Sequence, residues 1–369
     1  MQFVSKQMEY NRLFCMNYLD IPGAGTYTKV NVFQSAGKRR AIMKVNMRDV
    51  ARHAGVSVAT VSHVLNKTRH VTDATRERVM ESIRVLGYVP DPMARSFKMG
   101  KRNMVGFIVP DIANLFWSIM IEEVENTLAA HGYHLIIANT KETEQREIDH
   151  LLLLSAGMVD GIIIGSTLTD AALIDTLIPD QFPMVFIDRA PDNCQHDSIT
   201  ISNYASIYEG ICQLIRRGHT QIGCIPGLMR LSTTQERLQA YQDAMHAHGL
   251  EVPERFVQPG NSMSMSALRP METLLRAGCT ALAILNNVMA EDVMAYLERE
   301  KDQLGREVAL LGYREWGRGV SCAASSALID QPASQMGRLA AQQILRRIAE
   351  PAEKIKSVVL SSNLTIFDR

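Results

Sequence analysis

From Met104 onward, short apolar runs alternate with segments of helical periodicity, and this alternation constrains the fold more than any other feature. The apolar run at residues 104–110 is followed by a helical pattern at 116–132, and the same order repeats along the chain. Strands that alternate with helices form parallel sheets with helices on both faces. A second series starts near Tyr204, and the strands are too many for one small sheet. We therefore predict two α/β lobes, with a ligand cleft between them at the carboxyl ends of the strands.

A smaller, all-helical unit is predicted ahead of these lobes. Residues 47–88 show three short helical patterns, and a tight turn at Gly55 joins the first two. The expected helices are 47–54, a second helix from the N-cap Ser57 to Asn66, and a third that begins at Thr72 or Asp73 and ends at Gly87. Two short helices joined by a glycine-containing turn are typical of a helix-turn-helix, whose second helix enters the major groove of DNA.

Charge is distributed unevenly along the chain, although the formal net charge is zero. Residues 1–43 carry +4, from 6 Lys/Arg and 2 Asp/Glu; residues 44–102 carry +7, from 12 and 5; residues 103–369 carry −11, from 21 and 32. A small basic module on a large acidic body indicates that only the module meets a polyanion such as DNA. Charge alone leaves open a chance fluctuation of the surface.

Composition and motifs exclude several classes of protein. No run of 18 apolar residues occurs, and the N-terminus lacks the pattern of a signal peptide, so we expect a cytoplasmic protein with no membrane partner. The six cysteines are scattered without a CxxC pair, which argues against a zinc site or a disulfide framework. No GxGxxG, P-loop, GxSxG or HExxH motif is present, so we expect no enzymatic activity, cofactor or metal.

The residue identities of particular segments are more specific evidence for a family than the periodicity of apolar residues. The stretch VNMRDVARHAGVSVATVSHVLN and its continuation to MARSFKMGKR resemble the headpiece and hinge of the lactose-repressor family, closest to its purine and galactose branches. VDGIIIGS, PMVFIDR, RRGHTQIGCIPG, VALLGY and ALIDQP extend the resemblance through the core. The resemblance covers everything from about residue 44 and implies a DNA-binding transcriptional regulator, a repressor whose operator affinity a small effector controls.

The same resemblance implies the domain organisation. It predicts an all-α helix-turn-helix headpiece at 44–90, a hinge helix and linker at 91–102, and an α/β two-lobed, periplasmic-binding-protein-like effector domain at 103–369. Residues 1–43 lie outside it, and we expect a disordered or untranslated extension there. The chain stops at SSNLTIFDR without a leucine heptad, so we expect a homodimer rather than a tetramer on double-stranded operator DNA.

Base-reading residues are implied in the second helix of the headpiece. The resemblance places Val58, Ala59, His63 and Asn66 at base-facing positions, where His can bond a purine edge and Val or Ala can touch a thymine methyl. For Val58 and Ala59, packing inside the headpiece is the alternative. Polar side chains in and just after this helix are expected to bond phosphates, which position the protein without specifying sequence. They are Ser57, Thr60, Ser62 and Asn66, and Arg69 is a further expected DNA contact.

A second DNA contact is implied in the hinge. MARSFK resembles the family's hinge helix, in which an apolar residue, usually leucine, wedges into a central base step of the minor groove. Phe97 stands at that position here, flanked by Arg95 and Lys98 as groove or phosphate contacts. The alternative is an amphipathic linker whose Phe97 packs on the core.

The effector cleft is expected to gather residues from strand ends and helix starts. The resemblance places the aromatic pair Phe116 and Trp117 against the ligand, although core packing explains them equally well. The polar candidates follow predicted strands. They are Asp188, Arg189, Thr233, Arg237, Asn286, Asn287 and Arg314.

Arg314 departs from the family pattern, which has an aspartate at this position in many members. The exchange replaces an acceptor-only carboxylate with a donor-only guanidinium. Together with Arg189 and Arg237 it predicts a cleft with surplus positive charge, and therefore an anionic effector such as a sugar acid or sugar phosphate. The alternative is that Glu315 or Asp292 pairs with Arg314 internally.

Two other functions compete with a regulator. A periplasmic-type solute-binding receptor would fit the two lobes alone, but it would need a signal peptide and would not carry the basic headpiece. A sugar kinase or another α/β enzyme would need phosphate loops or catalytic clusters, which the sequence lacks.

Overall fold

The computed structural model describes residues 45–89, 102–191, 193–300, 302, 307–314 and 327–367. It divides into two units, Met1–Pro90 and Asp91–Arg369. The expected extension at 1–43 lies outside the described residues, as does the hinge at 91–102 apart from Arg102, so the domain boundaries there stay predictions.

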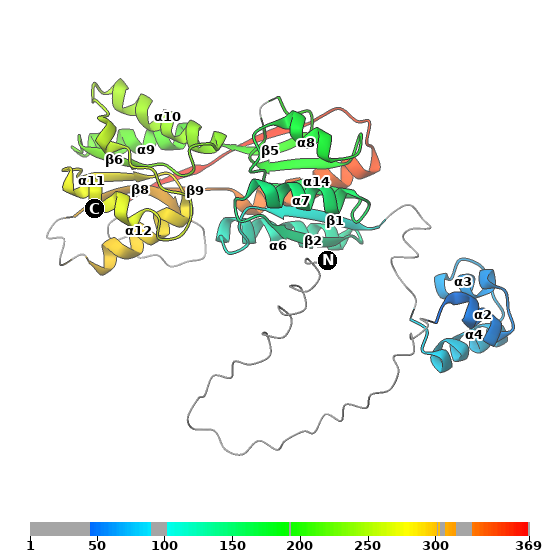
Figure 1. Cartoon of the computed structure of the whole chain (residues 1–369). Coiled ribbons are helices and arrows are strands. Elements are labelled where there is room, and N and C mark those ends of the chain that lie inside the picture. Colours follow the sequence, from blue (N-terminus) through cyan, green and yellow to red (C-terminus); the bar gives the residue numbers. More distant parts are fainter. Residues whose placement is uncertain are drawn as a thin grey trace, which may run out of the picture. The chain divides into compact units, whose positions relative to one another are not determined.

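The first unit is a three-helix headpiece, as the sequence predicted (Figure 1). Its helices are α2 (Met47–Ala54), α3 (Val58–Asn66) and α4 (Asp73–Leu86). Gly55 turns the chain between α2 and α3 with φ 64°, a left-handed conformation that glycine adopts without a side-chain clash. Ser57 is the N-cap of α3, because its Oγ accepts a hydrogen bond from the backbone N–H of Thr60 at 3.0 Å. Of the two candidate starts for α4, Thr72 is the N-cap, and Gly87 ends the helix as expected.

A small apolar core holds the three helices together. Val50 on α2, Val61 on α3 and Val79 on α4 are all fully buried, and Ala51, Ala54 and Val64 complete the cluster. Burial of one valine from each helix fixes their packing through the hydrophobic effect. The outer face of α3 is thereby left to solvent.

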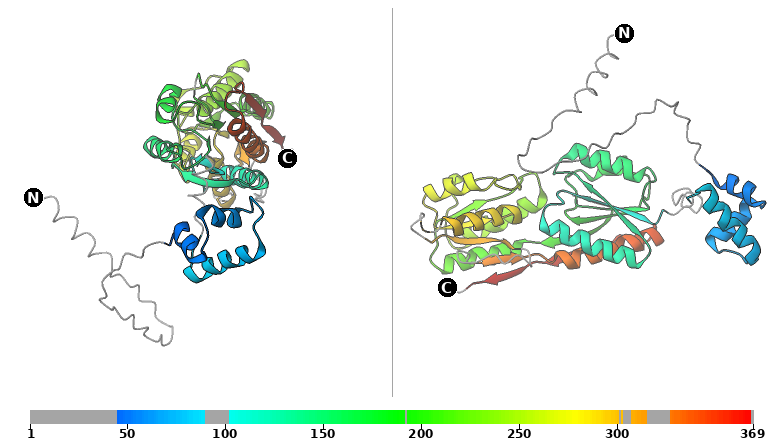
Figure 2. Two further views of the ribbon diagram at one scale, coloured as in Figure 1. Left: turned by 90° about the vertical axis from the view of Figure 1, so that its right-hand side faces the viewer. Right: turned by 90° about the horizontal axis from the view of Figure 1, so that it is seen from below.

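The second unit consists of two α/β lobes, which lie side by side in Figures 1 and 2. The first lobe has a six-stranded sheet in the order β10-β5-β4-β3-β1-β2, and its paired strands are all parallel. Helices α6 and α14 cover one face of this sheet and α7 and α8 the other. Its strands are β1 (Met104–Val109), β2 (His134–Asn139), β3 (Gly161–Ile164), β4 (Met184–Asp188), β5 (Asp197–Ser202) and β10 (Ser357–Ser361). Its helices are α6 (Leu115–Ala130), α7 (Glu144–Ser155), α8 (Ala171–Leu177) and α14 (Ala333–Ala349).

The second lobe has a five-stranded sheet in the order β11-β9-β8-β7-β6, in which only β11 runs antiparallel to its neighbour. Its strands are β6 (Ile222–Ile225), β7 (Ala281–Ile284), β8 (Ala309–Arg314), β9 (Ala327–Asp330) and β11 (Asn363–Ile366). Its helices are α9 (Tyr204–Arg216), α10 (Ser232–Ala247), α11 (Leu268–Arg276) and α12 (Asn287–Arg299), with a 3-10 turn at Glu254–Phe256. The two lobes predicted from the alternation of strands and helices are confirmed.

The chain passes between the lobes three times within the described residues. Asn203 joins β5 of the first lobe to α9 of the second, Gln331 and Pro332 lead from β9 back to α14, and Ser362 joins β10 to β11. The first lobe is therefore completed by the C-terminal part of the chain. The sequence patterns did not reveal this interleaving, because an apolar run does not specify which sheet it joins.

Candidate functional site

The exposed face of α3 is the candidate DNA-binding surface. Val58 is 41% exposed, and Ala59 beside it is also exposed. The expected alternative, packing inside the headpiece, does not hold for these two side chains, whereas Val61 and Val64 do fill the core. The first turn of α3 thus presents small apolar groups that can touch a base edge.

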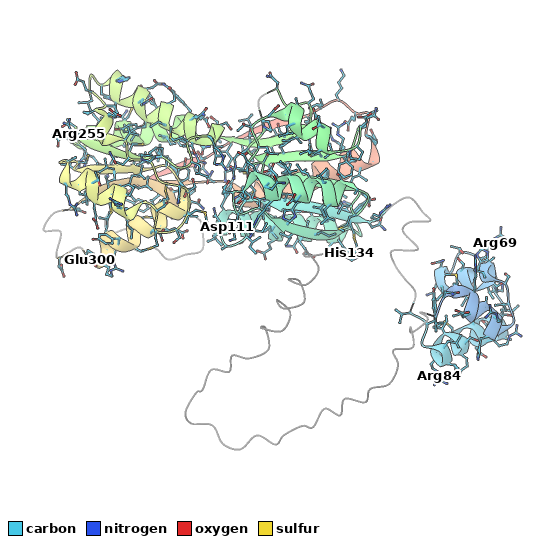
Figure 3. All side chains as sticks on the ribbon, viewed as in Figure 1. Arg69, Arg84, Asp111, His134, Arg255 and Glu300 are labelled. Carbon is cyan, nitrogen blue, oxygen red and sulfur yellow. The ribbon has the colours of Figure 1, made fainter. Side chains whose placement is uncertain are left out.

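The polar residues of α3 lie beside these groups and bond one another. His63 Nδ1 lies 2.8 Å from Thr68 Oγ1, and Asn66 Nδ2 donates to Ser62 Oγ at 3.2 Å. Thr60 Oγ1 lies 2.9 Å from Ser57 Oγ. Arg69 follows the helix in an exposed loop on the surface of the headpiece (Figure 3). The roles assigned to these residues on DNA stay predictions, as do those of Arg95, Phe97 and Lys98, which lie outside the described residues.

Between the two lobes lies a cavity of about 50 Å³. Its lining combines strand ends with helix starts, and Asp111 lies where the two lobes meet (Figure 3). The expected cleft residues found in the lining are Phe116, Trp117, Asp188, Arg189, Thr233, Arg237, Asn286 and Asn287. The structure therefore brings together eight of the nine, and the exception is Arg314.

The aromatic pair forms an apolar wall of the cavity. Phe116 and Trp117 lie in the first turn of α6, are almost fully buried, and pack edge to face with ring centroids 5.6 Å apart. Gly165 lies directly beneath the indole: a Cβ there would come within 2.1 Å of the ring. Trp117 is thus both part of the core and part of the lining, so the two interpretations of the sequence are compatible.

Asp188 is the last residue of β4 and Arg189 follows it, and the two form a charged cluster with Glu142. Arg189 donates to both Glu142 carboxylate oxygens, at 3.1 and 3.0 Å, and its Nε lies 3.5 Å from Asp188 Oδ2. Burial opposes the charge of Arg189, but Glu142 and Asp188 outweigh it and hold the pKa of Arg189 above its ordinary value. Burial raises the pKa of the Asp188 carboxyl, although Arg189 and Arg237 act in the opposite sense.

Arg237 reaches the cavity from α10 in the second lobe. Its guanidinium lies over the ring of Tyr313, 4.6 Å from the centroid, and its Nη1 donates to the backbone carbonyl of Leu285 at 2.9 Å. These contacts hold the group in place while part of it faces the cavity.

Several buried polar atoms of the lining have no hydrogen-bond partner among the described residues. One is an acceptor, Asp188 Oδ1, and three are donors: Arg189 Nε, Arg237 Nε and Gln331 Nε2. A buried polar atom without a partner costs free energy, on the order of 1–3 kcal/mol. Their convergence on one cavity indicates a place where a polar molecule binds.

Arg314 is not in the lining, so the prediction that it faces the ligand beside Arg189 and Arg237 is wrong. Its Nε and Nη2 each donate at 3.0 Å to a different oxygen of Asp330. The two residues are direct partners in the parallel pairing of β8 with β9. Neither partner considered from the sequence is confirmed, because Asp292 bonds Ser264 and Met265 instead and Glu315 lies outside the described residues.

Charges in the lining are instead nearly balanced. Asp111, Glu142 and Asp188 face Arg189 and Arg237, and Asp111 also pairs with Lys141 at 2.6 Å. The described lining offers no excess of cations to an anionic ligand.

Contacts across the cavity join the lobes directly. Asn287 Nδ2 donates to Asn114 Oδ1 at 2.7 Å, and Asn114 Nδ2 donates back to Asn287 Oδ1 at 3.4 Å. Arg230 of the second lobe donates to the Glu142 carbonyl at 2.9 Å and reaches Glu144 at 3.4 Å. The lobes are therefore closed over the cavity.

Sequence reasoning missed several residues of the lining. The polar ones are Asp111, Asn114, Glu142, Thr234, Ser262 and Gln331. Asn114 carries a signal that could have found it: it is the N-cap of α6, two residues before Phe116, and accepts from the Phe116 N–H at 3.0 Å. Gln331 directly follows a buried strand, as Arg189 does.

Other site types find no support in the described ranges. There, no group of three or more His, Cys, Asp or Glu side chains is arranged to hold a metal ion. No helix in the same ranges has the length and apolar character needed to cross a membrane.

Comparison with known proteins agrees with this architecture. Residues 46–91 match the family described as bacterial regulatory proteins, lacI family, and residues 102–366 match the periplasmic binding proteins and sugar binding domain of the LacI family. The HTH-type transcriptional repressor PurR of Vibrio campbellii is 33% identical over 307 residues, which cover 82% of this chain and 92% of the relative. PurR of Vibrio cholerae is 32% identical, over 82% of this chain and 91% of the relative.

Solved structures show the same fold. A complex of the transcriptional regulator CelR with cellobiose is 26% identical with a TM-score of 0.60, covering 87% of this chain and 98% of that one. The lac repressor dimer bound to operator and the anti-inducer ONPF is 23% identical with a TM-score of 0.71, covering 87% and 97%. The helix-turn-helix headpiece, the two-lobed effector domain and these matches together show that the chain belongs to the lacI family of bacterial regulatory proteins, DNA-binding repressors with a sugar-binding effector domain.

Proposed function

We propose that the cavity between the lobes binds an uncharged, polyhydroxylated small molecule that controls the affinity of α3 for an operator. The four unpartnered buried atoms carry this proposal. A hydroxyl group can donate to Asp188 Oδ1 and accept from Arg189, Arg237 or Gln331, so a molecule with several hydroxyls satisfies both kinds of atom. The balanced charges of the lining favour a neutral molecule over an anion.

The aromatic wall supports the same class of ligand. Phe116 and Trp117 offer an apolar surface beside the polar atoms. A sugar ring combines an apolar C–H face with a hydroxylated edge, so it can stack on one wall and bond the other. The closed cavity is small, and we infer that the ligand enters when the lobes separate.

On DNA, we propose that a homodimer reads a near-palindromic operator with one α3 in each half-site. The lac repressor dimer has been solved on its operator, and this chain shares its fold. Binding of the effector shifts the equilibrium between two arrangements of the lobes. The size of the change in DNA affinity is limited by the difference in the effector's affinity for these two arrangements. Action on chromosomal DNA implies a cytoplasmic location.

A thermal-shift screen of the full chain tests the ligand class. The probes are neutral sugars (D-ribose, D-glucose, cellobiose), the matched acid D-glucuronate, and the matched phosphate D-glucose 6-phosphate. A ligand of the folded state raises the melting temperature with dose; at 100 times the dissociation constant it adds about 2.7 kcal/mol of stability. We expect the shift with a neutral sugar, and a shift with the anions alone contradicts the proposal.

A matched pair of arginine variants locates the site. Arg237→Met should abolish the shift, because it removes a donor from the cavity. Arg255→Met removes an exposed arginine of the same lobe that lies over Phe256, 5.2 Å from the ring centroid, and should keep the shift. If Arg237→Met keeps the shift as Arg255→Met does, the ligand binds elsewhere.

A further inference from the structure

The passage at Asn203 is one of the three connections between the lobes in the described residues, and several hydrogen bonds hold it. Asn203 is fully buried, and its backbone N–H and that of Tyr204 both donate to Glu236 Oε1, at 3.2 and 3.3 Å. Its side-chain Oδ1 accepts from the Tyr313 hydroxyl at 3.2 Å, and its Nδ2 donates to the Ile201 carbonyl at 3.3 Å. Both the backbone and the side chain of this residue are therefore fixed by partners.

The residues that hold Asn203 also contact the cavity arginine. Tyr313 is 1% exposed, and its ring lies under the guanidinium of Arg237 while its hydroxyl bonds Asn203. Glu236 precedes Arg237 on α10, so a shift of that helical turn moves both side chains. A single tyrosine thus touches the ligand cavity's arginine at one end and the connection between the lobes at the other.

The connection at Asn203 is in turn bonded to the connection at Ser362. Ser206 Oγ donates to the Ser362 carbonyl at 3.0 Å, and Ser362 Oγ donates to Ser206 Oγ at 2.8 Å. Ser206 lies on the first turn of α9, three residues after Asn203. A displacement at one connection therefore acts on the next through fixed hydrogen bonds.

We propose that Tyr313 is a positioning residue that couples the state of Arg237 to the connection at Asn203, and so to the relative position of the lobes. The inference rests on the proposed function only in assuming that the ligand engages Arg237. A ligand that draws the guanidinium toward the cavity changes its stacking on Tyr313, and the phenol hydroxyl carries that change to Asn203. The ring supports the arginine, and the hydroxyl transmits its position.

Hydrogen–deuterium exchange of the full-length protein tests this coupling without any ligand. The readout is exchange in peptides that contain the backbone amides of Asn203 and Tyr204. Tyr313→Phe keeps the ring under Arg237 but removes the hydroxyl, and exchange there should rise about 2- to 10-fold, the effect of one hydrogen bond. Arg237→Met should raise exchange in the same peptides, because it removes the stacked group.

The double variant supplies the decisive comparison. If the hydroxyl transmits the change, Arg237→Met adds little further exchange in the Tyr313→Phe background, because the two changes act on one path. An undiminished effect of Arg237→Met in that background overturns the proposal.

Tyr241→Phe is the matched control. Tyr241 is fully buried in the same lobe, and its hydroxyl donates to the Ile222 carbonyl at 2.8 Å, a contact that involves neither the cavity nor a connection between lobes. It should lower global stability while leaving exchange at Asn203 and Tyr204 unchanged. If Tyr241→Phe raises exchange there as much as Tyr313→Phe does, the effect is general loosening and the proposal fails. A failed ligand screen, by contrast, would refute the proposed ligand class and leave this result standing.

Discussion

The side-chain amides of Asn114 and Asn287, 173 positions apart in the chain, donate hydrogen bonds to each other across the cavity. Asn114 belongs to the first lobe and Asn287 to the second, so the pair joins the lobes at the ligand site itself. Both residues also line the cavity. Closure of the lobes is therefore supported by groups that a ligand can contact.

Removing this pair should favour the open arrangement of the lobes. Asn287→Ala deletes both hydrogen bonds and leaves intact the capping bond that the Phe116 N–H donates to Asn114 Oδ1. Two such bonds contribute about 1–3 kcal/mol, which shifts the ratio of closed to open protein at least several-fold. Pulsed dipolar spectroscopy between spin labels at the exposed positions Glu125, in the first lobe, and Arg269, in the second, measures the distance between the lobes. The distance distribution of Asn287→Ala should contain more of the open arrangement than that of the wild type.

The control for this prediction is Asn139→Ala, which removes a contact to the Lys141 N–H inside one lobe. Its distance distribution should match that of the wild type. A distribution for Asn287→Ala that also matches the wild type contradicts a role for the pair in closure.

Loss of Arg314 should destabilise the protein. Arg314→Ala removes the bidentate hydrogen bonds to the Asp330 carboxylate, which is 5% exposed. Removal of one partner from a buried ion pair costs about 3 kcal/mol or more. Urea unfolding at pH 7 measures the loss in the free energy of unfolding. Arg276→Ala breaks a pair with Glu272 in which the arginine is 80% exposed, and it should have almost no effect. Equal losses in the two variants would argue against the Asp330 pairing.

Stability should fall in acid through Asp197. This carboxylate is fully buried, and burial alone would raise its pKa; Arg347, the Lys356 N–H and Arg346 outweigh burial and hold the pKa below its ordinary value. A group whose folded pKa is lowered stabilises the fold above the unfolded pKa, about 3.9 for aspartate, and loses that contribution as pH falls through the folded pKa.

The variant Arg347→Met isolates this contribution. It should lower the free energy of unfolding at pH 7 by about 1.5–3 kcal/mol, because it removes two charged hydrogen bonds from a buried carboxylate that keeps only Arg346 and the Lys356 N–H. Without Arg347 the pKa of the Asp197 carboxyl rises, so the carboxyl protonates earlier in the variant as pH falls and the difference in the free energy of unfolding from the wild type should narrow. Denaturant unfolding of the variant and of the wild type, from pH 7 to pH 3, measures both free energies of unfolding. A constant difference over this range would show that Asp197 is not the titrating partner.

Substitutions on α3 should change which DNA sequence the protein prefers. Ala59→Arg adds donors to an exposed position on the first turn of α3, and His63→Ala removes one a turn later. A good base contact discriminates by about 1–3 kcal/mol. Selection from random DNA, followed by binding measurements at fixed salt, compares the preferred sites. Met80→Ala alters a side chain on α4 that is 51% exposed and should select the wild-type sequence. Equal weakening of α3 variants on every sequence points to phosphate contacts instead.

Local rules in the sequence determined the elements of both units. The bounds of α2 and α3 follow from the apolar spacing that buries Val50 and Val61, from the cap at Ser57 and from the glycine turn between the helices. These signals act within a few residues, so they can be predicted before the tertiary structure is known. The cleft could be predicted in outline for a related reason: carboxyl ends of parallel strands meet at one edge, which places Asp188 there.

Only the tertiary structure decided how distant residues combine. Arg314 appeared to be a cleft cation because it follows an apolar strand, but the register of β8 with β9 sets it opposite Asp330. Likewise, Asn114 meets Asn287 and Tyr313 meets Asn203 because the chain passes repeatedly between the lobes. Periodicity reports which face of an element is buried; it does not report which element lies against that face. The partners of a charged or polar group depend on that second fact, so they emerge only when the strands are paired and the lobes are closed.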